Sequence, residues 1–116
     1  MTRRVETTPL GRTIITESGR ISVSDPDQCI EYEISGNAPV QGFGVVVGRD
    51  IYFRARHDGW SFDIADHKGD LPSDGRADID GFYREGQYDK ASYMPFEVAM
   101  RIIDQCLREY IDSAVA

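Results

Sequence analysis

The stretch IYFRARHDGWSFDI, residues 51–64, decides the fold that this chain is expected to adopt. Asp58-Gly59 at its centre is a strong two-residue turn signal, because a type I′ hairpin turn needs positive φ at both central residues. With the turn there, Asp63 is expected opposite Arg54 and Phe62 opposite Ala55. One face of the hairpin then collects the apolar side chains Ile51, Phe53, Ala55, Trp60, Phe62 and Ile64. The turn chemistry and the apolar pattern therefore predict the same antiparallel hairpin.

Further strands are expected on either side of this hairpin. Residues 13–24 form a second hairpin if Ser18-Gly19 is its turn, and residues 28–35 alternate between apolar and acidic side chains as a half-buried strand does. Residues 43–47 are expected as one more strand and residues 79–83 as a short one. The chain is thus predicted to form an antiparallel meander of about five to seven strands.

The C-terminal region predicts one helix, from residue 95 to about residue 112. Pro95 suits the first helical position, Glu97 suits the first turn, and Asp104 is placed to pair with Arg108 one turn later. The apolar stripe of the helix consists of Ala99, Ile102, Ile103, Cys106, Leu107 and Tyr110. A single stripe needs a single partner surface, so the expected fold class is α+β, with the helix packed on one face of the meander.

Length and composition indicate one domain. The chain has 116 residues, of which 41% are hydrophobic, and this suits a single α+β domain over residues 12–116 after a flexible N-terminal arm over residues 1–11. The first residues lack an apolar segment of the signal-peptide kind, and apolar runs are as short as residues 45–47. Two cysteines without framework spacing suit a reduced chain, although one disulfide remains an alternative. We expect a cytoplasmic protein that does not bind membranes.

Charge is distributed unevenly along the chain. The net charge of −7 argues against a nucleic acid partner, and residues 58–80 carry seven aspartates against Lys68 and Arg76, a net of −5. This segment is either a solvated surface or a face for a basic partner or a cation. In the second interpretation, with tyrosine and arginine as common interface residues, the binding residues are Asp66, Asp70, Asp74, Asp78, Asp80, Tyr83, Tyr52 and Arg56.

The patterns that suggest a metal site are incomplete. His57 and His67 lie at opposite ends of the predicted hairpin, roughly 20 Å apart, and so they cannot share an ion. Residues 76–87 imitate a calcium loop, but Arg76 and Gln87 stand where its first and last ligands belong. An irregular calcium loop that uses Asp74, Asp78 and Asp80 is left as an alternative. No cofactor and no metal are expected.

Catalytic patterns are equally incomplete. The chain has no Gly-x-Ser-x-Gly motif, and neither cysteine is next to a histidine in the sequence. Glu31 and Glu33 share one strand face and are a candidate acid–base pair, but exposed carboxylates on half-solvated strands are far more common. The glycines of GFGVVVG, residues 42–48, lead into a strand and a turn, so turns or bulges explain them better than phosphate binding does.

The segment GFYREGQYDKASYMPFEVAMRIIDQCLREY, residues 81–110, resembles the end of some small bacterial toxin-immunity proteins. These proteins finish with a strand, a loop and a helix of the form Pro-x-Glu-x-Ala, which Pro95, Glu97 and Ala99 match. The resemblance implies a non-catalytic inhibitor that binds a toxin domain, and an acidic surface suits a basic nuclease partner. The expected function is therefore a non-enzymatic protein that binds a protein partner. The alternative is a small enzyme or ligand-binding domain with a pocket between sheet and helix, and the oligomeric state is left open.

Overall fold

The computed structural model describes residues 3–8, 11–36, 38–65 and 82–115, and within this part the chain forms one antiparallel sheet and one long helix. The sheet has eight strands in the order of the sequence, so it is a pure meander. The strands are β1 (Arg4–Thr7), β2 (Thr13–Glu17), β3 (Arg20–Asp25), β4 (Ile30–Ser35), β5 (Val40–Val46), β6 (Arg49–Arg56), β7 (Gly59–Ile64) and β8 (Phe82–Gln87). The helix is α1 (Phe96–Val115), and two short 3-10 turns are η1 (Pro26–Gln28) and η2 (Ala91–Tyr93).

The predicted fold class is confirmed, with one strand more than the expected range. Part of the segment expected as an arm forms β1, which pairs with β2 along its whole length. All four residues of β1 are exposed, and two of them, Arg4 and Glu6, are charged. Short, charged edge strands are a common protection against pairing with other chains.

The central hairpin exists, but the prediction of its turn was wrong. Residues 57 and 58 form the turn, so Arg56 is opposite Gly59, and Arg54 is opposite Ser61 rather than Asp63. Phe62 likewise lies opposite Phe53 rather than Ala55. This shift of two residues preserves which side chains share a face, because side chains alternate with a period of two. The apolar pattern therefore identified the faces correctly while the turn signal misplaced the cross-strand partners.

The β2–β3 hairpin has the predicted register, with Glu17 opposite Arg20 around the turn at residues 18 and 19. The β5–β6 hairpin turns instead at Val47 and Gly48, which both have positive φ, of 49° and 78°. That turn lies one residue earlier than expected, and β6 begins at Arg49.

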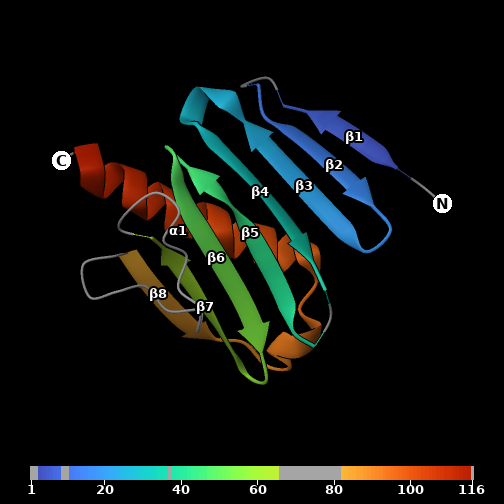
Figure 1. Ribbon diagram of the computed structural model, residues 1–116. Coiled ribbons are helices and arrows are strands. Elements are labelled where there is room, and N and C mark those ends of the chain that lie inside the picture. The colour runs from blue at the N-terminus through green and yellow to red at the C-terminus, as the bar shows by residue number, and fades with distance from the viewer. Residues whose placement is uncertain (1–2, 9–10, 37, 66–81, 116) are drawn as a thin grey trace.

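The helix crosses one face of the sheet, behind its middle strands (Figure 1). It begins one residue later than expected, and the backbone N–H groups of Val98 and Ala99 donate to the carbonyl of Pro95. The predicted apolar stripe is confirmed, because its buried members Ala99, Ile103, Cys106 and Leu107 join the core cluster. On the sheet side this cluster contains Phe53, Phe62 and Ile64, each with at most 1% of its surface exposed. No helix in the described part of the chain is both long and apolar enough to cross a membrane.

Three glycines allow the core to pack closely. A Cβ atom on Gly42 would lie 3.2 Å from Cδ1 of Ile103, so this position lets α1 approach β5. A Cβ atom on Gly44 would overlap the backbone of β4, 2.5 Å from Cα of Tyr32. At Gly86 it would lie 2.7 Å from the Trp60 ring, which covers this glycine. The glycines of the GFG sequence are therefore packing positions, and Phe43 between them points to the opposite face.

Candidate binding surface

One row of side chains crosses the face of the sheet opposite α1, which we call the open face. The strand pairing makes each member of this row a direct neighbour of the next. From β2 to β8 the row is Ile15, Ser22, Glu33, Phe43, Tyr52, Asp63 and Tyr83. The row therefore joins apolar, acidic and aromatic side chains on one surface.

The open face has a buried half and an exposed half. On β6 and β7, Tyr52 is only 7% exposed and Asp63 is 0% exposed. On β5, Phe43 is 45% exposed and Val45 is 36% exposed. Neighbouring exposed apolar side chains form a patch, and apolar patches are common at contact surfaces. The exposed half is therefore the better candidate for a contact surface.

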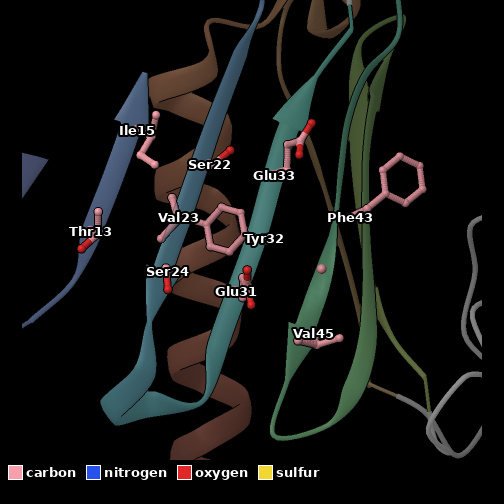
Figure 2. Close-up of a pocket in the computed structure, with 11 residues that line it drawn as sticks. Thr13, Ile15, Ser22, Val23, Ser24, Glu31, Tyr32, Glu33, Phe43 and Val45 are labelled. Carbon is pink, nitrogen blue, oxygen red and sulfur yellow. The ribbon is translucent and has the colours of Figure 1, made fainter. Parts of the chain in front are cut away.

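The exposed half contains a groove of about 400 Å³ between β2 and β5 (Figure 2). We call it the β2–β5 groove. Its lining residues are Thr13, Ile15, Ser22, Val23, Ser24, Glu31, Tyr32, Glu33, Phe43, Gly44 and Val45. Figure 2 shows the two glutamates on β4, between the serines of β3 and the side chains of β5.

The two glutamates make the β2–β5 groove acidic. Glu33 lies 3.6 Å from Nη1 of Arg20, and both side chains are about half exposed. Glu31 forms no ion pair with any residue that the structure describes. The lining contains hydroxyls and carboxylates but no histidine, cysteine or lysine. These groups can accept hydrogen bonds and attract a cation.

Comparison of this chain with protein-family models, with curated proteins and with solved structures finds no match. The candidate surface is therefore argued from its own residues alone.

The residues predicted for a binding surface are only partly brought together. Asp66, Asp70, Asp74, Asp78 and Asp80 lie outside the described residues, as do His67 and the proposed calcium loop up to residue 81. The structure therefore places none of these aspartates.

Of the other three predicted binding residues, Tyr52 and Tyr83 belong to the same row, with Asp63 between them. Tyr52 was expected as a contact residue, but it is buried, and its hydroxyl accepts a hydrogen bond of 2.9 Å from Nε2 of Gln41. Tyr83 is half-buried, and its hydroxyl donates to Glu85. Arg56 is exposed at the end of β6, away from this row and beside the hairpin turn.

Sequence reasoning missed Phe43 as a surface residue, because it read residues 43–47 as a continuous apolar strand. The signal that could have identified it is the flanking pair of glycines. Gly42 and Gly44 face α1 and Tyr32, so the alternation of a strand requires Phe43 to face the other way. The ring of Phe43 packs beside that of Tyr52, with a centroid distance of 5.0 Å. This contact with a buried neighbour holds Phe43 in place on the open face.

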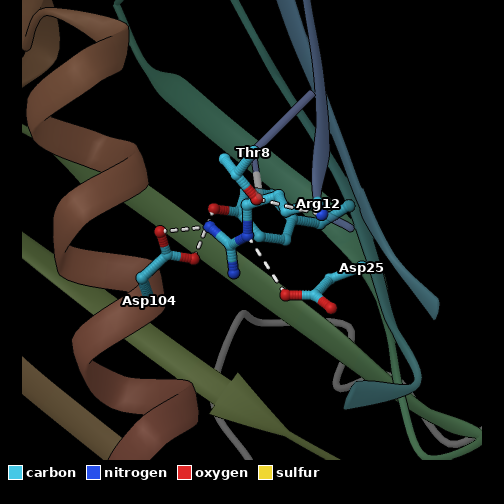
Figure 3. Close-up of polar contacts among 5 residues, drawn as sticks. Thr8, Arg12, Asp25 and Asp104 are labelled. Atoms are coloured by element: carbon cyan, nitrogen blue, oxygen red, sulfur yellow. Dashed lines mark hydrogen bonds and ion pairs between the residues drawn. The ribbon is translucent and has the colours of Figure 1, made fainter. Parts of the chain in front are cut away.

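A second polar cluster lies on the helix side of the sheet (Figure 3). Nη1 of Arg12 is 2.7 Å from Oδ2 of Asp104, and Nε of Arg12 is 3.2 Å from Oδ2 of Asp25. The hydroxyl of Tyr32 donates to Oδ1 of Asp104 at 2.8 Å. Asp104 therefore binds across to the sheet, and not along the helix to Arg108 as expected. The cluster ties β2, β3 and β4 to α1.

The electrostatics of this cluster follow from its partial burial. Burial by itself would lower the pKa of Arg12, but the hydrogen bond to Asp104 and the nearby carboxylate charge outweigh burial and raise it. Burial, together with the charge of Asp104, raises the pKa of the Tyr32 phenol far above its ordinary value. Arg12 thus stays charged and Tyr32 stays protonated, which suits a structural role rather than proton transfer.

Proposed function

We propose that this chain is a non-enzymatic binding protein that takes a protein partner on the exposed half of its open face. The observation that carries the proposal is the exposed pair Phe43 and Val45 beside the carboxylate of Glu31. Apolar contacts supply affinity once they are buried, and a neighbouring charge selects the partner.

Val47 supports the same surface from its backbone conformation. It lies two residues beyond Val45, is 60% exposed and has a φ of 49°. A β-branched side chain is disfavoured in this left-handed region, which favours asparagine and glycine. In the isolated chain, little burial of the Val47 side chain offsets the cost of this backbone conformation. Burial of Val47 against a partner would offset this cost.

Charge complementarity indicates a cationic partner. The chain carries a net charge of −7, and among the residues that the structure describes, the charged side chains that line the β2–β5 groove are Glu31 and Glu33. A symmetric contact between two copies through the groove would bring these glutamates close to their own counterparts, which repel. A partner with lysine and arginine at its surface is attracted instead.

The most concrete form of this proposal is an inhibitor of the toxin-immunity kind. The resemblance of residues 81–110 supports it, and Pro95, Glu97 and Ala99 lie at the start of α1 as that pattern implies. A basic nuclease would meet the charge requirement of the groove.

The first test is capture of the partner from a lysate of the cells that make the protein, with matched charge variants. The variant E31Q/E33Q removes two charges from the groove, and the control D89N/E109Q removes two charges from exposed positions outside it. We expect one basic protein to bind the wild type and the control in equal amounts, to bind E31Q/E33Q weakly, and to be released by salt. Equal binding to all three chains, or no partner at low salt, would overturn the proposal.

The inhibitor form has its own test. We expect the captured partner to arrest growth when it is expressed alone, and we expect co-expression of this chain to restore growth. Co-expression of F43S should fail to do so. A partner that is harmless when expressed alone would rule out the inhibitor form and leave a binding protein of another kind.

A second candidate function is the binding of a small ligand between sheet and helix. Two hollows of about 480 Å³ and 590 Å³ lie between the first strands and α1, and the larger is lined in part by Ile14, Ile21, Phe96 and Met100. Both hollows are lined by apolar and charged side chains, and their size is within the range of small-molecule sites. Native mass spectrometry of the purified protein decides, because a bound metabolite adds mass and the chain mass alone removes this candidate.

A further inference from the structure

We infer that the β2–β5 groove receives an arginine side chain of the partner. This inference rests on the proposed function, and it names the chemical group that the groove recognises. The groove combines three features that fit a guanidinium group. These are a floor of small hydroxyl side chains, a rim with two carboxylates, and apolar walls.

Strand pairing gives the groove its shape. Two rows cross it, and in both rows a serine of β3 lies between a larger side chain of β2 and a glutamate of β4. The rows are Ile15, Ser22, Glu33, Phe43 and Thr13, Ser24, Glu31, Val45. Because serine is small, the centre of the groove is low, and the side chains on either side form its walls (Figure 2). A long, narrow side chain fits such a slot better than a bulky one.

The polar groups of the slot match a guanidinium. Glu31 and Glu33 are two residues apart on one strand, which separates their Cα atoms by about 7 Å. An arginine carries five N–H donors in one plane and has no acceptor, whereas carboxylates and hydroxyls accept. The head of the arginine can therefore bond to a glutamate and to Ser22 or Ser24 at once. Its methylene groups then lie against Ile15, on the β2 side of the serine row.

The chain itself already places a guanidinium against this rim. Arg20 contacts Glu33 at 3.6 Å, and it also holds Glu17 at 2.6 Å. If a partner arginine replaces Arg20 at Glu33, Arg20 keeps Glu17 and no charge is left alone. The displaced contact is half exposed and longer than the one that remains, so it is the weaker of the two. The groove is thus ready to accept an outside arginine at little cost.

Arginine is favoured over lysine for a geometric reason. Lysine presents a compact ammonium group that cannot form two parallel hydrogen bonds to a carboxylate, and its strong hydration opposes transfer into a partly dry groove. A planar guanidinium can also lie along the exposed aromatic ring of Phe43.

The test is a titration of the isotope-labelled full chain, followed by the shifts of its backbone amide signals in NMR spectra. The probes are N-acetyl-arginine amide, N-acetyl-lysine amide and the uncharged analogue N-acetyl-citrulline amide. We expect the arginine probe to move the signals of Ser22, Ser24, Glu31 and Glu33. The lysine probe should bind at least about fivefold more weakly, and the citrulline probe should have no effect. E31Q/E33Q should lose the response and D89N/E109Q should keep it.

Equal effects of arginine and citrulline, or of arginine and lysine, would overturn the inference, as would a response that E31Q/E33Q retains. Failure of the inference differs from failure of the proposed function. If the arginine probe has no effect while capture of the partner is lost in F43S, the open face binds a partner without an arginine in the groove. If the arginine probe binds while capture of the partner is unchanged in every open-face variant, the groove binds arginine but the proposed function is wrong.

Discussion

Arg12 and Asp104 are 92 residues apart in the sequence, and their side chains meet at 2.7 Å. This contact joins the start of β2 to the middle of α1, and Tyr32 completes it from β4. It holds the N-terminal strands against the helix at a place where two hollows leave the packing incomplete.

The cluster predicts a stability loss in D104A. This substitution leaves the buried Tyr32 hydroxyl without its acceptor and leaves Arg12 with Asp25 as its remaining partner, and we expect a loss of about 2 kcal/mol in the free energy of unfolding. Urea denaturation followed by circular dichroism measures the loss. R108A, an exposed change one turn later, is the control and should change the stability by less than about 0.5 kcal/mol. Equal losses in the two variants would contradict this account of the cluster.

The core predicts a larger loss in F62A. Phe62 is fully buried in β7 and lies opposite Phe53, so its removal leaves a cavity in the main core cluster. We expect a cost of about 3–5 kcal/mol in denaturant melts. A cost below about 1 kcal/mol would mean that this face of the hairpin is not the core.

The β5–β6 turn predicts a gain of stability with a loss of binding. V47N places asparagine where both turn residues have positive φ, and we expect the protein to gain about 1 kcal/mol, because little apolar burial is lost at an exposed position. Thermal melting measures this gain. The same variant should bind the captured partner more weakly, since Val47 would contact the partner. A variant with higher stability and unchanged affinity would remove Val47 from the binding surface.

The two cysteines predict different thiol reactivity. Both are free; Cys29 is exposed, and Cys106 is buried on the side of α1 that packs against the core. Burial raises the pKa of Cys106 to about 12, so at pH 8 almost none of this thiol is ionised, and reagents cannot reach it. A colorimetric thiol assay should therefore count one fast thiol in the native protein and two in denaturant. Two fast thiols in the native state would show that the packing of α1 against the sheet does not shield Cys106.

Local sequence patterns were enough to predict the layers of the fold. The alternation in residues 51–64 and the 3.6-residue period of the helix each report which side of an element is apolar, and that property survives an error in the turn. The turn itself was misread because Asp58-Gly59 has the ideal composition, whereas the chain turns at residues 57 and 58. Pairing with β8 adds constraints on β7 that a single hairpin motif does not include.

The contacts between distant residues, and the exposure of side chains on the open face, were harder to predict. Asp104 seemed to have a partner in Arg108, and no local signal points across 92 residues to Arg12. Tyr52 has the composition of a contact residue, but its neighbours on the open face bury it. Phe43 has the composition of a core residue, but the approach of α1 and Tyr32 to the glycines beside it leaves it on the surface.

By itself, the sequence determined the class of the fold, because the periods of apolar side chains and the capping residues of the helix act over only a few residues. The tertiary structure alone decided how the hairpins pair with one another, and therefore which side chains from different strands become neighbours on the open face. That choice depends on how side chains from distant strands fill one shared space. The β2–β5 groove is a product of this choice, because its lining comes from four strands, whereas its two glutamates were visible in the sequence as members of one strand face.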